Sequence, residues 1–151
     1  MRWQHEVATI VPVAILRCSV MKKPQRQRRR AQVRRVEGLP VGIDLKALAA
    51  KATYGGSPYH KDIPSFAGRP PKPRPGASIC PRGLAKQRDR VEKWLREAIE
   101  QGHVGLWQGD FPLRVWHREG STVFEAVLTR SKVGEYHGYP LEPNEKVEGL
   151  P

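Results

Sequence analysis

Several side chains in the second half of the chain are of the types that cleave RNA without a metal ion. Such cleavage needs a base for the 2′-hydroxyl proton, an acid for the leaving oxygen, and cations for the charge that develops on phosphorus. We expect Glu125 or His117 to be the base, and His137 or Tyr136 to be the acid. Arg114 and Arg118 are expected to bind the phosphate, and Lys132 to make a further contact with the nucleic acid. His60 and Lys61 stand in an irregular segment that could fold over the same surface.

Other kinds of chemistry lack their motifs. The chain has no GxGxxG, P-loop, GxSxG or HExxH sequence and no paired zinc ligands, so we expect neither a cofactor nor a metal. Its two cysteines, Cys18 and Cys80, form no CxxC pair, which makes a reducing cytoplasm the default location. Each histidine could instead be structural. The alternative function is then a non-catalytic protein-interaction module with a basic localising arm.

The candidate residues fall on expected β-strands that follow a helix. A helical stripe of apolar residues runs from Leu84 to Gln101, ends at Gly102, and predicts a long helix. Period-two alternation then predicts strands over 104–108, 111–118, 121–130 and 136–141. A shorter helix is expected over 44–52, with Asp44 as its N-cap.

The hairpin register decides which side chains share a face. If Glu119-Gly120 is a two-residue loop, the opposite pairs are Val115 with Phe124, Leu113 with Ala126, Arg114 with Glu125, and Trp116 with Val123. We expect the first two pairs to face the helix. Trp116, flanked by arginines on the other face, could stack a nucleotide base. The alternative is a half-covered Trp116 beside an ordinary cross-strand ion pair.

These elements predict an α+β fold, with one short and one long helix packed on a 3–4-stranded antiparallel meander. We expect three parts: residues 1–38, a basic leader without fixed structure; residues 39–83, the short helix and a Pro/Gly-rich segment; and residues 84–151, a compact domain. The order of helix and meander over roughly 84–141 resembles small bacterial toxin ribonucleases of the RelE and barnase-like kind. The likeness is one of arrangement, and no residue role is carried over from it.

The formal charge of +12 lies in the first half of the chain. Residues 1–82 hold 17 Lys+Arg and 4 Asp+Glu, whereas residues 83–151 hold 10 and 11. The run from Met21 to Arg35 is the densest part and is typical of a nucleic-acid-binding arm. Its candidate contacts are Arg28, Arg29, Arg30, Arg34 and Arg35. We therefore expect RNA or another nucleic acid as partner, a protein partner as the alternative, and no membrane. Met21 could be the true start.

Overall fold

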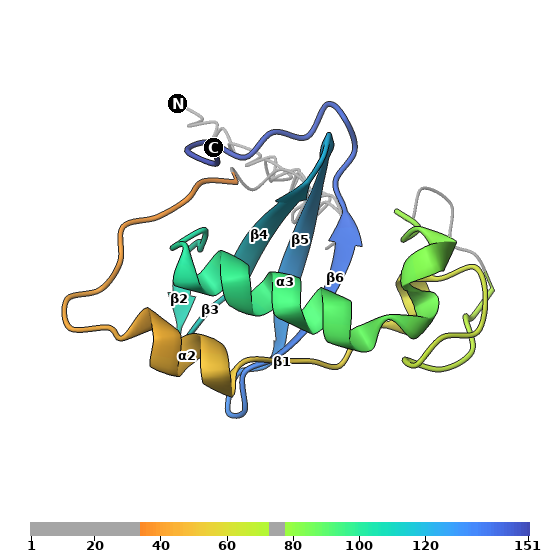
Figure 1. Cartoon of the computed structure of the whole chain (residues 1–151), viewed down its shortest axis with the longest axis horizontal. Helices are drawn as coiled ribbons and strands as arrows, with labels where there is room; N and C mark the ends of the chain where they lie inside the picture. Colours follow the sequence, from red (N-terminus) through yellow and green to blue (C-terminus); the bar gives the residue numbers. More distant parts are fainter. Residues whose placement is uncertain (1–33, 73–77) are drawn as a thin grey trace, which may run out of the picture. The chain divides into compact units, whose positions relative to one another are not determined.

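The computed structural model describes residues 34–72 and 78–151, which belong to one compact unit, Val33–Pro151. Figure 1 shows its elements along the chain. The helices and 3-10 turns are α2 (Leu45–Lys51), η1 (Pro58–His60), η2 (Arg82–Lys86) and α3 (Arg88–Glu100). The strands are β1 (Thr53–Tyr54), β2 (Trp107–Gln108), β3 (Phe111–Pro112), β4 (Arg114–Glu119), β5 (Thr122–Arg130) and β6 (Glu135–Pro140). Residues 1–33 of the predicted leader, including Arg28, Arg29 and Arg30, lie outside the described residues.

Both predicted helices form, close to their expected bounds. Asp44 caps α2, since its carboxylate accepts the backbone N–H groups of Lys46 and Ala47. In α3 the buried residues fall on one stripe, and this stripe packs on the sheet and on α2. No helix in the described part of the chain is long and apolar enough to cross a membrane.

The fold is α+β, with a four-stranded sheet in the order β1-β6-β5-β4 and a separate two-stranded β2-β3 pair. β4, β5 and β6 pair antiparallel, but β1 pairs parallel to β6. A purely antiparallel sheet was therefore the wrong expectation. Thr53 and Tyr54 follow α2 directly, and the short connection from that helix delivers them to the free edge of β6.

The hairpin register differs from the expected one by two residues. The turn is Gly120-Ser121, so Glu119 pairs with Thr122 and Trp116, not Arg114, lies opposite Glu125. Gly120 has φ +58° and Ser121 has no positive φ, which is the pattern of a type II′ turn with glycine first. Because a shift of two residues preserves alternation, each side chain stays on the face where it was expected.

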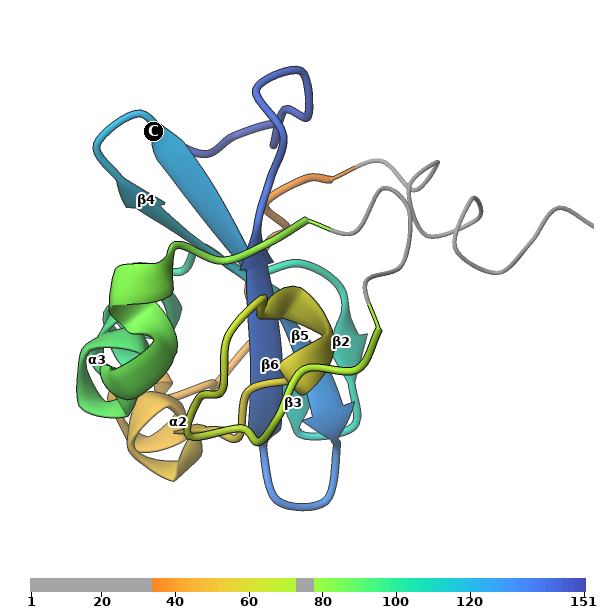
Figure 2. The same cartoon turned by 90° about the vertical axis from the view of Figure 1, so that its right-hand side faces the viewer.

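The sheet has a helix-side face and an outer face. Trp94 of α3 stacks on His117 and contacts Phe124, which places these two strand residues on the helix side. Figure 2 shows α2 and α3 on one side of the strands and the β2-β3 pair on the other. Trp116 and Glu125 alternate with the helix-side residues and therefore point to the outer face.

Candidate functional site

The outer face of the sheet carries two cross-strand rows of side chains. One row joins Arg114, Val127 and His137, because each pairs with the next in register. The adjacent row joins Trp116, Glu125 and Tyr139 in the same way. Neighbouring strands lie about 4.8 Å apart, so the ends of each row are separated by about 10 Å. This face thus brings predicted site residues from three strands within reach of one another.

Glu125 lies at the centre of this face and is completely buried. Its Oε2 accepts bonds from Arg34 Nε at 2.7 Å and Trp116 Nε1 at 2.9 Å. Its Oε1 accepts the Tyr139 hydroxyl at 2.6 Å, and Arg114 Nη1 lies 3.2 Å from Oε1 and 3.3 Å from Oε2. A carboxylate enclosed by four donor groups is poorly placed to take a proton from a substrate. Glu125 is better suited to holding the groups around it.

Arg34 crosses this face from the segment that precedes α2. Its backbone carbonyl accepts Glu148 N–H, and its guanidinium also pairs with Glu145 at 3.2 Å. Burial alone would lower the pKa of Arg34, but the charges of Glu125 and Glu145 outweigh it and raise the pKa. Arg34, one of the two described residues of the basic run, is therefore built into the domain as a buried charge.

His60, His137 and Tyr139 form a ring cluster beside Glu125. The His60 ring lies 4.7 Å from the Tyr139 ring and 5.9 Å from the His137 ring, centroid to centroid, and is nearly parallel to both. η1 carries His60 onto this face, as expected for the irregular segment. All three side chains are partly exposed. Two imidazoles and a phenol thus share a surface that solvent can reach.

Hydrogen bonds orient the two imidazoles. His60 Nδ1 lies 3.1 Å from the Ser78 carbonyl oxygen, which can only accept, so Nδ1 carries a proton. In a neutral ring Nε2 is then the basic nitrogen. His137 Nδ1 lies 2.7 Å from Thr129 Oγ1, a group that can donate or accept. His60 is consequently suited to the role of a base, and His137 can serve in either role.

The phenol of Tyr139 is held in its protonated form. Burial, followed by the charge and hydrogen bond of Glu125, raises the pKa of Tyr139 to about 12, although Arg114 and Arg34 act in the opposite direction. Tyr139 was missed in the sequence. The signal that could have found it is its spacing of two residues from His137, which puts both on one face of β6.

Two of the predicted catalytic residues lie away from the outer face. His117 stacks on Trp94 at 5.0 Å on the helix side, with its Nε2 3.5 Å from Glu119. Tyr136 is fully buried, and its hydroxyl donates to the Pro112 carbonyl at 2.7 Å. The structure therefore does not bring the predicted set of Glu125, His117, His137 and Tyr136 together on one surface.

Trp116 is neither the exposed platform nor the half-covered side chain that were the two alternatives from the sequence. Its side chain is only 1% exposed: its indole N–H is bonded to Glu125, and its ring fills the space that a Cβ at Gly105 would occupy. The segment 103–106 pairs along β4 and closes that edge of the sheet. A base could not stack on Trp116 without displacing this cover.

The remaining predicted cations lie at the surface. Arg35 pairs with Glu148 at 2.6 Å, with both side chains more than half exposed. Arg118 extends the outer face beyond Trp116, and its Nε donates to the Pro151 carbonyl at 2.9 Å. Lys132 lies exposed in the turn between β5 and β6. Arg35 and Arg118 thus both have partners in the C-terminal segment.

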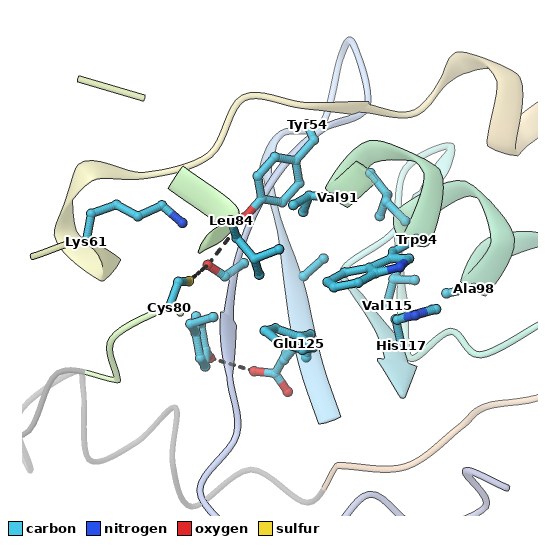
Figure 3. Close-up of a pocket in the computed structure, with 15 residues that line it drawn as sticks. Tyr54, Lys61, Cys80, Leu84, Val91, Trp94, Ala98, Val115, His117 and Glu125 are labelled. Carbon is cyan, nitrogen blue, oxygen red and sulfur yellow. Dashed lines mark hydrogen bonds between the residues drawn. The ribbon is translucent and has the colours of Figure 1, made fainter. Parts of the chain in front are cut away.

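A small cavity of about 30 Å³ lies between the sheet and α3. Figure 3 shows Lys61 and Cys80 at one end of it and Trp94 and His117 at the other. Burial raises the pKa of the Cys80 thiol, although the nearby Lys61 acts against this. The cavity has room for about one water molecule, so it does not hold a substrate.

The described residues contain no group of three or more His, Cys, Asp or Glu side chains that could hold a metal ion. Comparisons with known proteins give no match: no family model, no curated protein and no solved structure is significantly similar to the chain. The geometry of the site therefore carries the functional argument alone.

Proposed function

We propose that this protein binds RNA and cleaves it on the outer face of the sheet, as a toxin-like ribonuclease that needs no metal ion. The observation that carries the proposal is the placement of His60 within 5.9 Å of His137, on the face that also holds Arg114. Two neighbouring imidazoles can supply both the base and the acid of a phosphoryl transfer near neutral pH. In this proposal the base is His60, and not Glu125 or His117 as the sequence suggested.

In the proposed step, His60 Nε2 takes the proton of the RNA 2′-hydroxyl. The 2′-oxygen then forms a bond to phosphorus, while the bond between phosphorus and the 5′-oxygen breaks. His137 gives a proton to this leaving oxygen. The products are a 2′,3′-cyclic phosphate and a free 5′-hydroxyl, and His60 and His137 end the step with their protonation exchanged.

Arginines supply the positive charge that the reaction needs. Arg114 lies in the same cross-strand row as His137, and the two backbone positions are about 10 Å apart across the sheet. The long side chain of Arg114 can reach over this distance toward a shared phosphate. Glu125 acts as a positioning residue, since it fixes Arg114 and Tyr139 by direct hydrogen bonds. Arg35 and Arg118 would bind phosphates further along the strand.

The experiment is a cleavage assay with the full chain and fluorescent single-stranded RNA in the presence of EDTA. We expect His60→Gln and His137→Gln each to lower the rate at least 100-fold, because acid–base groups contribute about 10²–10⁴. The matched control is His103→Gln, since His103 lies close to His117 on the helix side. Wild-type activity in both site variants, or no cleavage by the folded wild type, would refute the proposal.

The second candidate is the non-catalytic protein-interaction module. The observation that favours it is a loop of exposed apolar side chains before α2, where Leu39 is 45% and Val41 fully exposed. Exposed apolar groups close together mark surfaces that bind proteins. Folded protein that neither binds nor cleaves RNA would leave this candidate in place of the first.

A further inference from the structure

We propose that the C-terminal segment, residues 141–151, is an acidic strap that occupies RNA-binding arginines of the outer face and competes with RNA for them. The inference rests on the proposed function and adds a regulator to the same site. The strap holds three glutamates (Glu142, Glu145 and Glu148) and one lysine, Lys146. Its carboxylates present to arginines the same paired oxygen acceptors that a phosphate would.

Within residues 34–72 and 78–151, the three arginines that the strap contacts were candidates for binding nucleic acid. Glu145 pairs with Arg34 at 3.2 Å, and Glu148 pairs with Arg35 at 2.6 Å. Arg118 donates to the carbonyl of Pro151 at 2.9 Å. Arg34 and Arg35 are adjacent in the chain, whereas Arg118 lies on β4, so the strap contacts both the segment before α2 and the sheet.

The strap is buried at its beginning, and its side chains are exposed or partly exposed further on. Leu141 is buried, and its N–H donates at 2.8 Å to the carbonyl of Val123 in β5. Beyond Leu141, backbone bonds join Glu148 to Arg34 and Val36. Leu141 would thus keep the strap attached while its acidic part leaves the arginines.

One ion pair of the strap, Arg35–Glu148, is of the kind that an external polyanion can replace, whereas the Arg34–Glu145 pair is largely buried. Arg35 and Glu148 are 58% and 57% exposed, and such pairs contribute about 0–1 kcal/mol because water competes for both groups. RNA brings several phosphates at once and gains from counterion release. The exchange therefore favours RNA at low salt and the strap at higher salt.

The test compares two double variants that change the charge by the same amount. Glu145→Gln with Glu148→Gln removes the carboxylates that face arginines. Glu100→Gln with Glu142→Gln removes two exposed carboxylates that pair with no arginine in residues 34–72 and 78–151. Gln keeps the size and an acceptor oxygen, and thermal unfolding would confirm that each variant folds.

The measurement is binding of fluorescein-labelled RNA with 2′-O-methyl sugars, which blocks cleavage, at several salt concentrations. We expect the strap variant to bind at least fivefold more tightly than wild type, and the control variant to change less than twofold. The slope of log K against log salt should steepen by about 1.4 in the strap variant, or about 0.7 for each of two phosphates.

Equal gains in both variants would show that net charge alone acts, and would overturn the strap while leaving RNA binding intact. Absence of RNA binding by all three folded proteins would instead refute the proposed function, and the strap with it. The two failures are therefore distinguishable.

Discussion

Glu125 shows how a residue of catalytic type can serve a structural purpose. A carboxylate removed from water needs partners for its charge and for its lone pairs, and Arg34, Arg114, Trp116 and Tyr139 supply them. The sequence identified Glu125 and Arg114 as neighbours on one face. It could not reveal that Arg34, 91 positions earlier in the chain, would enclose the carboxylate.

Replacing Glu125 by Gln should be strongly destabilising. The substitution keeps the shape but leaves Arg34 and Arg114 without the carboxylate that compensates their buried charges, which typically costs about 3–5 kcal/mol. Urea unfolding of the full chain measures this change. Glu119→Gln is the control, because the ion pair of Glu119 with Arg90 is about half exposed, and its loss should change stability by less than about 1 kcal/mol. Similar losses in the two variants would contradict the assigned role of Glu125.

The raised pKa of Tyr139 predicts that the folded protein loses stability at high pH. Its pKa of about 12 in the fold lies above the value of about 10 expected for an unfolded chain. The stabilisation is therefore fully present below about pH 10 and disappears as the pH rises from about 10 to about 12. Over this rise in pH the free energy of unfolding should fall more in the wild type than in Tyr139→Phe. Equal falls would argue against the buried bond from Tyr139 to Glu125.

At the scale of elements, alternation predicted the faces of β4 and β5 although the register was wrong by two residues. Alternation with a period of two determines which face each side chain points to, and a register shift of two residues leaves that face unchanged. Which residues pair across the two strands depends on which two residues form the turn. The sequence allowed a turn at Gly120-Ser121 as well as at Glu119-Gly120. The parallel β1 was not predictable in this way, because two residues show no period.

The turn between β5 and β6 is held by contact with β3. Gly134 has φ +66°, and a Cβ there would overlap the Phe111 ring. Gly120 has φ +58°, but a Cβ added to it would meet no atom within 4 Å beyond its chain neighbours. A substitution at Gly120 therefore measures the cost of the positive φ without a steric overlap. We expect Gly120→Ala to cost about 1–2 kcal/mol and Gly134→Ala clearly more, measured by chemical unfolding. Equal costs would mean that Phe111 yields without penalty.

At the scale of the whole molecule, the candidate site is assembled from segments that are distant in sequence. η1 contributes His60, β6 contributes His137 and Tyr139, and the residues before α2 contribute Arg34. Local periodicity placed the strands and α3, but it carries no information on which irregular segments cover which face. This is why the sequence placed Tyr136 and His117 among the candidates for the same site as Glu125, whereas the fold gathers His60, His137 and Tyr139 there.

The most direct test of the central claim is the chemistry of the cleaved ends. Wild-type protein would be incubated with a defined RNA in EDTA, and the products would be examined by mass spectrometry. Attack by the 2′-oxygen predicts fragments that end in a 2′,3′-cyclic phosphate and begin with a 5′-hydroxyl, with no cut at a single 2′-deoxy position. Fragments with 3′-hydroxyl and 5′-phosphate ends, or RNA left intact, would contradict an acid–base site formed by His60 and His137.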